Sequence, residues 1–270
     1  MSTFAVILPA AGQSRRFHDK AYKKPFAPLG GRAVWLHSAE RFMNRADVKQ
    51  VIVCISAEDR EFFNMKFGAN IAILGVEVIE GGEHRTDSVQ RAIERVKGDV
   101  DFIAVHDAAR PCIADPWIDS VFAAAERDGA AILAAPVQAT LKRAEQRGAG
   151  SGEQGAKRPG TSGSSPPAPR SLQISATVDR ESLWEAQTPQ VFRRDLLIEA
   201  YAKRGREPVT DDAQLIERLG KPVTIVPCSQ LNIKITTRDD LKLAEQVLKV
   251  LPKPKLEGFN HPFAGDDLWR

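Results

Sequence analysis

Short apolar runs alternate along the chain with longer stretches in which apolar residues recur at helical spacing. The apolar runs predict strands over residues 4–8, 51–56, 76–80, 102–106, 130–137, 223–227 and 232–236. The longer stretches predict helices over residues 33–44, 58–66, 86–97, 115–127, 193–203, 211–219 and 238–250. Nearly continuous apolar strands that alternate with helices are typical of an α/β fold, in which helices cover both faces of a mostly parallel central sheet.

Three of the predicted helices have start signals. Thr86 and Thr210 stand where N-cap residues are expected, and Thr237-Arg-Asp-Asp240 has the spacing of a capping box. Ligands of such sheets bind beyond the carboxyl ends of the strands. The segments PAAGQSRR, GGEHR and DAARP fall at such ends, so we expect ligand contacts there.

Residues 147–171 break the pattern, because they are rich in Gly, Ser and Pro and have no periodic apolar face. This composition predicts a loop. The loop separates two possible strands, over residues 139–144 and 174–180. We therefore interpret residues 137–187 as a β-arm that projects from the main sheet.

Composition narrows the classes of function. The 270 residues suffice for one sizeable core, and we assign a single domain to residues 1–250 and a tail to residues 251–270. The net charge of +3 is unlike that of a general nucleic-acid binder, so no nucleic-acid partner is expected. No apolar run approaches the ~18 residues of a membrane span, and no basic-then-apolar leader begins the chain, so no membrane partner is expected. The widely spaced Cys54, Cys112 and Cys228 favour free thiols and a cytoplasmic location.

Five Lys and Arg residues follow the first predicted strand within one short segment, ILPAAGQSRRFHDKAYKKPF. The segment is neither a P-loop nor a G-x-G-x-x-G dinucleotide motif. Its small residues Ala10, Ala11 and Gly12 let backbone N–H groups approach an anion closely. Arg16 can bind phosphate oxygens in a bidentate manner, and Lys24 can add a point charge. The segment therefore fits a triphosphate site, and a solvated basic loop is the alternative.

Several motifs occur in one order along the chain: PAAG, GGEHRTDSV, VHDAARP, ILAAPV, TVDR, LWEAQTPQVF, VTDDA and NIKITTRDDL. Together they make the chain similar to the 2-C-methyl-D-erythritol 4-phosphate cytidylyltransferase family over about residues 4–250, apart from residues 147–171. The resemblance implies a Rossmann-like nucleotidyltransferase fold whose β-arm clasps a second subunit, giving a homodimer. It also implies transfer of CMP from CTP to 2-C-methyl-D-erythritol 4-phosphate, with release of pyrophosphate, in the non-mevalonate isoprenoid pathway.

The resemblance gives the amino-terminal cations a role. Arg16 and Lys24 match two cations that stabilise the transition state at the α-phosphate of CTP. The family usually has Pro-Lys-Gln before an aromatic residue, whereas this chain has Lys-Lys-Pro-Phe with one extra residue upstream. Lys24 is the better match, and Lys23 stays the alternative.

The segment GGEHRTDS would recognise the base. Gly82 and Glu83 can face the amino edge of cytosine, and the Ser88 hydroxyl can bond its carbonyl. A helix-capping role is the alternative for Ser88. Ala108, in DAARP, belongs to the same expected substrate-binding set.

Asp107 is the predicted Mg²⁺ ligand, because a hard cation shared with triphosphate oxygens needs only one or two carboxylates. The alternative is a turn Asp bonded to its own backbone. Leu231 occupies a position where the family often has an acidic residue, so a second carboxylate ligand stays an open question. Arg110 either braces the site or contacts the acceptor. His106 is assigned a structural role, because a phosphate nucleophile is already ionised near pH 7 and needs no base.

Five residues match those that hold the acceptor in the family: Lys234, Arg180, Thr140, Thr188 and Thr210. Lys234 and Arg180 are expected to hold the acceptor phosphate for attack. Arg180 and Thr140 lie on the predicted arm, and the resemblance implies that they reach the site of the neighbouring subunit.

Two other functions compete with this one. A ribitol 5-phosphate cytidylyltransferase would have the same fold and nucleotide, but the PAAG, HDAARP and TVDR segments favour methylerythritol phosphate. A catalytically silent nucleotide-binding scaffold would be expected to have lost Arg16, Lys24 or Asp107, and all three are present.

Deleting about residues 150–170 is expected to leave turnover nearly intact, because that stretch offers no residue that matches a family role. A shorter loop also changes the closure entropy little, by roughly 0.6 kcal/mol for each factor of two in length. Steady-state rates of the deletion variant and the full chain, with light scattering for the oligomeric state, check this. A deletion variant that is dimeric yet inactive contradicts it.

Overall fold

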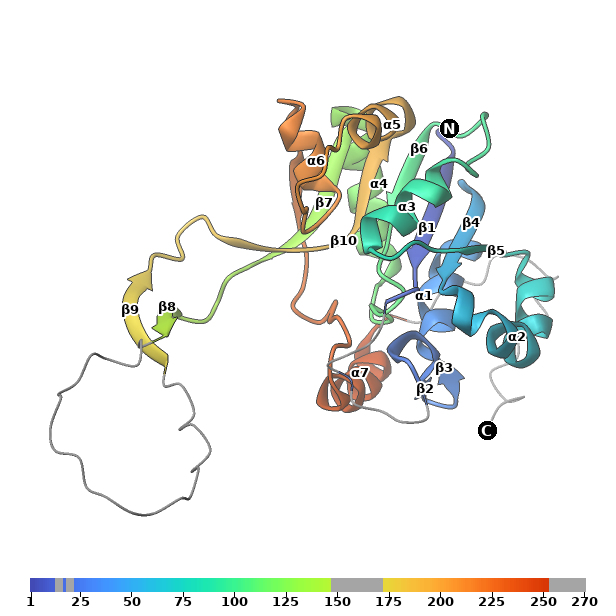
Figure 1. Ribbon diagram of the computed structural model, residues 1–270, viewed down its shortest axis with the longest axis horizontal. Helices are drawn as coiled ribbons and strands as arrows, with labels where there is room; N and C mark the ends of the chain where they lie inside the picture. Colours follow the sequence, from blue (N-terminus) through green and yellow to red (C-terminus); the bar gives the residue numbers. More distant parts are fainter. Residues whose placement is uncertain (13–16, 18–21, 147–171, 253–270) are drawn as a thin grey trace, which may run out of the picture. The chain divides into compact units, whose positions relative to one another are not determined.

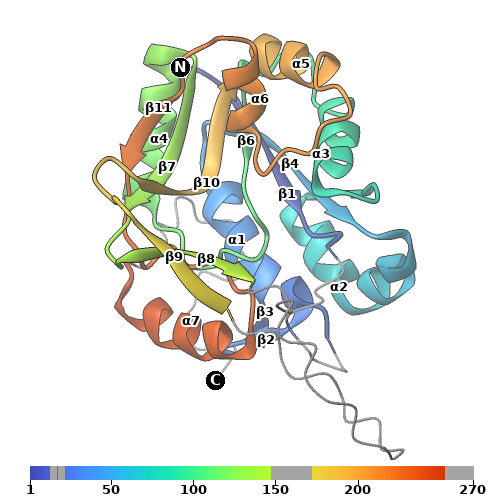
Figure 2. The same cartoon turned by 60° about the vertical axis from the view of Figure 1, so that its left-hand side comes forward.

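The computed structural model describes residues 1–12, 17, 22–146 and 172–252. Seven strands within them form one sheet in the order β11-β7-β10-β6-β1-β4-β5 (Figure 1; β11 is labelled in Figure 2). Their bounds are β1 Phe4–Pro9, β4 Val48–Ile55, β5 Glu77–Glu80, β6 Phe102–Val105, β7 Ala130–Pro136, β10 Trp184–Arg193 and β11 Thr224–Pro227.

The sheet is mostly parallel, as the sequence predicts. Strand β1 pairs in parallel with β4 and β6, and parallel pairs also join β4 to β5 and β7 to β11. Strand β10 runs antiparallel to β6. The sequence pattern missed β10, because Gln187, Thr188 and Gln190 are polar although they are buried in it.

Helices cover both faces of the sheet. One face packs against α1 Val34–Met43, α2 Arg60–Leu74 and α4 Asp115–Asp128. The other packs against α3 Arg85–Ile93, α5 Arg194–Ala202 and α6 Ala213–Arg218 (Figure 2). Strand β1 shows why both layers form: Phe4, Val6 and Leu8 belong to the first core, whereas Ala5 and Ile7 belong to the second.

A third, smaller core lies around α7 Arg238–Val250. Its apolar residues Ala244 and Val247 belong to one cluster with Leu29 of the short hairpin formed by β2 Pro28–Leu29 and β3 Arg32–Ala33. The predicted capping box starts this helix, since Thr237 Oγ1 accepts a hydrogen bond from the backbone N–H of Asp240.

Two other predicted helix starts are wrong. The N-cap of α3 is His84 rather than Thr86, and the N-cap of α6 is Asp212 rather than Thr210. In α3 the backbone N–H of His84 is bonded instead by the Asp87 carboxylate, at 3.1 Å. This carboxylate bonds the N–H of the N-cap residue itself, a different donor from the N2 or N3 N–H that an N-cap threonine hydroxyl would bond.

The predicted strand over residues 232–236 is also wrong, because the segment is irregular. Its Ile235 N–H donates to Ala109 O at 2.8 Å, and Ile233 N–H donates to Leu231 O within the same loop. The buried Asn232 and Ile235 thus anchor the segment against the loop that follows β6, and not in a sheet.

The chain divides into two units, Met1–Ala135 with Ala186–Arg270, and Pro136–Glu185. In the second unit β8 Leu141–Gln146 and β9 Leu172–Val178 pair antiparallel, at the two possible strands of the predicted arm. The predicted loop over residues 147–171 and most of the tail lie outside the described residues. Among the described helices, none combines the length and apolar character needed to cross a bilayer.

Candidate active site

Two adjoining hollows lie beyond the carboxyl ends of β1, β5 and β6, where the sequence predicts ligand contacts. The first hollow, of about 130 Å³, is lined by the turn after β1, the Gly-Gly segment after β5 and Lys24. The second hollow, of about 200 Å³, is lined by residues of β10 and of the loop before α6. Arg85, Asp107 and Lys234 line both hollows, so this charged group stands where they meet.

The turn after β1 and the Gly-Gly segment pack tightly together. A Cβ atom on Gly81 would lie 2.7 Å from both Ala11 Cβ and Ser88 Oγ. A Cβ atom on Gly82 would lie 2.3 Å from Asp87 Cβ. Only glycine fits at these two positions, and Gly82 lies at the wall of the first hollow. The predicted Ala10, Ala11 and Gly12 line the same hollow.

The predicted base-recognition residues Gly82, Glu83 and Ser88 all line the first hollow. The Ser88 hydroxyl accepts a hydrogen bond from Gly82 N–H at 3.0 Å and bonds His84 O at 3.2 Å. Ser88 is almost fully buried, so its hydroxyl braces the loop that holds Gly82 and Glu83. A direct contact between Ser88 and the base stays a prediction.

The structure separates the two adjacent lysines. Lys23 Nζ lies 2.8 Å from Asp59 Oδ2 and also pairs with Glu58. Burial lowers the pKa of Lys23, but the hydrogen bonds to Asp59 and Glu58 outweigh it and leave the pKa raised. Lys24 begins the short 3₁₀ helix Lys24–Phe26 and lines the first hollow. The predicted Arg16 lies outside the described residues.

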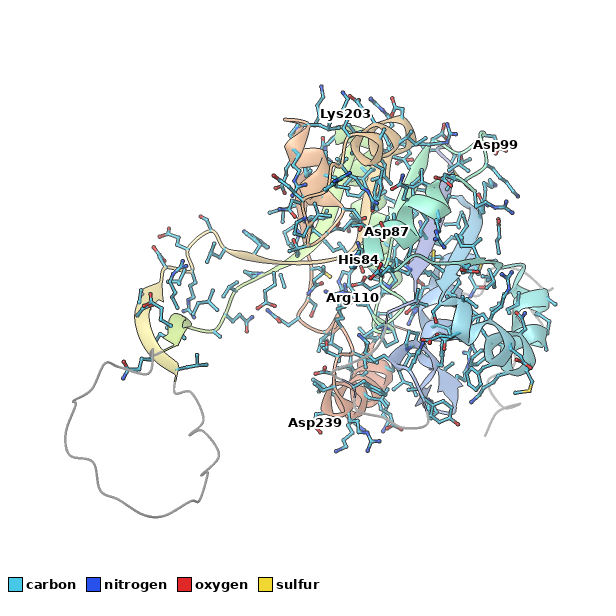
Figure 3. The ribbon with its side chains drawn as sticks, in the orientation of Figure 1. His84, Asp87, Asp99, Arg110, Lys203 and Asp239 are labelled. Carbon is cyan, nitrogen blue, oxygen red and sulfur yellow. The ribbon has the colours of Figure 1, made fainter. Side chains whose placement is uncertain are left out.

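Asp107, which follows β6, is surrounded by three cations. Its Oδ2 lies 2.7 Å from Lys234 Nζ and 3.6 Å from Arg110 Nε, and its Oδ1 lies 3.2 Å from Arg85 Nε. Burial alone would raise the pKa of Asp107, but the charges of Arg85, Lys234 and Arg110 hold it well below its usual range. The carboxylate is therefore ionised throughout the physiological pH range. Figure 3 labels Arg110, one of these three cations, and His84, the residue that precedes Arg85 in the chain.

Sequence reasoning missed Arg85 and Asn232. Arg85 lies inside a motif that was assigned to the base, and its pairing with Asp107 joins residues 22 positions apart. Asn232 is fully buried and donates from Nδ2 to Gln187 Oε1 at 3.0 Å and to the carbonyl of residue 188 at 2.9 Å. The backbone carbonyl of Asn232 accepts a hydrogen bond from Arg110 Nη1 at 2.6 Å. Asn232 thereby ties the segment with Lys234 to the rest of the site, and the signal in the sequence is its place in the Asn-Ile-Lys motif.

Thr188 and His106 form a buried pair behind Asp107. Thr188 Oγ1 accepts from the backbone N–H of Asp107 at 3.0 Å and lies 3.1 Å from His106 Nδ1. The other ring nitrogen of His106 lies 3.1 Å from Arg110 O. Burial lowers the pKa of His106 to about 4, so the ring is neutral near pH 7 and fits the structural role expected of it. Thr188 lines the second hollow, and its contact with the acceptor stays a prediction.

The buried ring makes stability depend on pH. His106 has a pKa of about 4 in the folded protein, against an ordinary value of 6.5, so the unfolded chain takes up the proton first as the pH falls. The free energy of unfolding is expected to fall by about 1.4 kcal/mol per pH unit from this group between pH 6.5 and 4. Urea unfolding at a series of pH values, for the wild type and His106→Gln, checks this. The slope should flatten in the variant, and parallel curves would contradict the prediction. His37, whose pKa is also lowered to about 4 by burial, contributes equally to both proteins.

The remaining predicted residues lie in different places. Thr210 is exposed and lines the second hollow. Ala108 is buried with its carbonyl bonded by Ser38 Oγ at 3.1 Å, and the wall of the first hollow is formed there by Asp107 and Ala109. The second unit holds two further predicted residues, the exposed Thr140 and Arg180. Within that unit Arg180 donates to the carbonyl of residue 138, and a contact with the acceptor stays a prediction.

Comparison with known proteins agrees with the motifs. The family model of 2-C-methyl-D-erythritol 4-phosphate cytidylyltransferase matches residues 4–156 and 168–250. The protein of that name from Rhodopirellula baltica is 38% identical over 258 residues, which cover 92% of this chain and 95% of the relative. The one from Bacillus mycoides is 35% identical over 252 residues, which cover 93% of this chain and 100% of the relative.

A solved structure gives the same result for the fold. The crystal structure of the Thermus thermophilus 2-C-methyl-D-erythritol 4-phosphate cytidylyltransferase matches with a TM-score of 0.66 at 30% identity, covering 93% of this chain and 100% of the other. The expected nucleotidyltransferase fold is thereby confirmed. On the family match, the sequence relatives and the shared fold, this chain belongs to the 2-C-methyl-D-erythritol 4-phosphate cytidylyltransferase family.

Proposed function

We infer that the protein transfers CMP from CTP to 2-C-methyl-D-erythritol 4-phosphate and releases pyrophosphate, in the non-mevalonate isoprenoid pathway. The observation that supports this most directly is the position of Asp107 with Lys234 and Arg85, where the two hollows meet. A nucleotide in the first hollow and an acceptor phosphate in the second would bring the reacting atoms to this charged group.

The reaction needs positioning and charge neutralisation more than covalent chemistry. A phosphate oxygen of the acceptor attacks the α-phosphorus of CTP, the bond to the bridging oxygen breaks, and pyrophosphate leaves with that electron pair. We propose that backbone groups of Ala10, Ala11 and Gly12 hold the triphosphate, while Lys24 and Arg16 stabilise the charge that develops at phosphorus.

The second hollow suits a phosphate group. Three cations, Arg85, Arg110 and Lys234, line it together with the hydroxyl side chains of Thr188 and Thr210. Lys234 is already held by Asp107, so little side-chain entropy is lost when it binds the acceptor. We propose that Lys234 and Thr210 hold the acceptor, and that Arg110 braces the loop through its bond to Asn232 O.

A magnesium ion fits this site through Asp107. Among the described residues no group of three or more His, Cys, Asp or Glu side chains gathers to bind a metal, so an ion would take most of its ligands from phosphate and water. The Asp107 carboxylate would supply one ligand in place of one of its present bonds to Arg85, Arg110 or Lys234. When bound, Mg²⁺ would neutralise phosphate charge as a Lewis acid.

We also propose a homodimer formed through the second unit. Leu172 and Ile174 on β9 are 67% and 66% exposed, and Trp184 nearby in sequence is 38% exposed. Exposed apolar side chains on a two-stranded hairpin favour a partner that covers them. Arg180 and Thr140 would then reach the neighbouring subunit's site.

The free thiols of Cys54, Cys112 and Cys228 fit a reducing cytoplasm.

Pyrophosphate release tests the function. The protein is incubated with Mg²⁺, each of the four nucleoside triphosphates, and either 2-C-methyl-D-erythritol 4-phosphate or ribitol 5-phosphate. Release with CTP and the methylerythritol acceptor is expected. Turnover with ribitol 5-phosphate alone would refute 2-C-methyl-D-erythritol 4-phosphate as the acceptor, and no release with either acceptor would favour a silent scaffold.

Light scattering of the wild type and of Ile174→Glu tests the dimer. The variant should be monomeric.

A further inference from the structure

A buried carboxylate behind the two hollows has no part in the mechanism above. Asp212, at the N-cap of α6, is 0% exposed. Its Oδ2 lies 2.7 Å from Arg85 Nη1, and its Oδ1 accepts a hydrogen bond from the Tyr201 hydroxyl at 2.5 Å. Each carboxylate oxygen therefore has a partner, one on the side of the site and one on the side of the core.

The position of Asp212 is set by the core. Tyr201 of α5 is 3% exposed and belongs to the same apolar cluster as Leu215 of α6. The backbone N–H groups of Asp212 and Ala213 both donate to Gln190 Oε1, each at 3.0 Å, which ties the start of α6 to β10. The carboxylate is thus held at a fixed point by three elements, independently of any ligand.

Arg85 spans the distance between this fixed carboxylate and the hollows. Its Nη1 bonds Asp212, and its Nε lies 3.2 Å from Asp107 Oδ1. A guanidinium group is planar and rigid, so two carboxylates that contact different nitrogens fix its orientation. Without Asp212, Arg85 would keep its pair with Asp107, a carboxylate that also pairs with Lys234 and Arg110.

Stability alone is a poor reason for this arrangement. A buried ion pair is often no more stabilising than apolar residues of similar volume, because both charges must lose their water. The fixed charge of Asp212 does, however, limit how far the long Arg85 side chain can move toward Asp107, the carboxylate that the proposed reaction needs.

We propose that Asp212 and Tyr201 are positioning residues for cytidylyl transfer, which hold Arg85 in place beside Asp107. Asp212 pairs with the Nη1 end of the Arg85 guanidinium, so Arg85 does not bind Asp107 with both ends. Asp107 and Lys234 thereby keep the geometry that receives the triphosphate and the acceptor. The inference rests on the function proposed for the group around Asp107.

The test compares Asp212→Asn and Tyr201→Phe with the wild type. Asp212→Asn keeps the shape and an acceptor for Tyr201 but removes the charge that holds Arg85. We expect kcat to fall about 10- to 100-fold in Asp212→Asn, the scale seen when groups that orient metal ligands are removed, and to fall less in Tyr201→Phe. Calorimetry of Mg²⁺–CTP without acceptor should show weaker binding in Asp212→Asn, although loss of a negative charge alone would strengthen the binding of a polyanion.

Leu215→Ala is the matched control. It removes packing from the same core cluster and helix but changes no charge, so it should lower the melting temperature with little change in kcat below it. The proposal is overturned if Asp212→Asn keeps the wild-type kcat, if its Mg²⁺–CTP binding is tighter, or if Leu215→Ala at an equal loss of stability shows the same fall in kcat. If Asp212→Asn does not fold, Tyr201→Phe decides by the same readouts.

Asp107→Asn, measured beside them, separates this inference from the proposed function. An active Asp107→Asn variant means that the site itself is misassigned. An inactive Asp107→Asn beside a fully active Asp212→Asn means that only the positioning role fails.

Discussion

Replacing Lys24 by alanine is expected to lower kcat by about 10²- to 10³-fold, the usual loss for one preorganised electrostatic donor. Lys24 lines the first hollow beside Ala10, Ala11 and Gly12, where the triphosphate is proposed to lie. Its charge is needed most when negative charge builds up at phosphorus, so KM for CTP should change less than kcat. Steady-state rates of pyrophosphate release with CTP and the methylerythritol acceptor measure both constants.

Lys23→Ala is the control, since it removes the same charge from the adjacent residue. Lys23 is engaged by Asp59 at 2.8 Å and by Glu58, so its loss should affect stability slightly and kcat by no more than about threefold. If instead Lys24→Ala loses less than about threefold and Lys23→Ala shows the large effect expected of a preorganised donor, the catalytic role belongs to Lys23.

The two lysines illustrate what a sequence can and cannot determine. Motif matching favours Lys24 as the catalytic cation of the Lys-Lys-Pro-Phe segment and leaves its neighbour Lys23 as the alternative. The choice depends on Asp59, which lies 36 positions away in sequence. Its carboxylate engages one lysine and leaves the other at the wall of the hollow.

The fold followed from hydrophobic periodicity wherever strands were apolar on both faces, as in β1 and β4. The pattern failed for β10, whose buried Gln187 and Gln190 are satisfied by hydrogen bonds to Ser229, Asn232, Asp211 and the start of α6. It failed in the opposite direction at residues 232–236, where two isoleucines flank Lys234 in an irregular segment. The apolar side chains of this segment pack in the third core, around α7. An irregular segment that is buried in this way has the same short apolar pattern in its sequence as a strand.

The site residues that lie in recognised motifs could be predicted, but the pairings between residues far apart in the sequence could not. Asp107 and Lys234 were each assigned from their motifs, and the structure joins them at 2.7 Å. Asp212 lies in the VTDDA motif, where the resemblance assigns a role to Thr210 alone. Its pairing with Arg85 joins residues 127 positions apart, which no local pattern encodes.

Replacing Asp107 by asparagine is expected to lower kcat by about 10²- to 10³-fold. The amide keeps the shape of the side chain but leaves Arg85, Arg110 and Lys234 without their shared counter-charge. The three cations would then repel one another and move, and the proposed Mg²⁺ ligand would be lost. The rate should therefore need a higher Mg²⁺ concentration to reach half its maximum, which a titration of pyrophosphate release against Mg²⁺ measures.

Asp59→Asn is a closely matched control for this change. Asp59 and Asp107 pair with a lysine at 2.8 and 2.7 Å, and their side chains are 12% and 10% exposed. Both substitutions break a Lys–Asp pair of similar length and burial, but only Asp107 lines the hollows. If Asp59→Asn lowers kcat as much as Asp107→Asn, the loss comes from a disrupted ion pair in general. If Asp107→Asn alone loses activity and its Mg²⁺ dependence shifts, the carboxylate acts where the triphosphate and the acceptor meet.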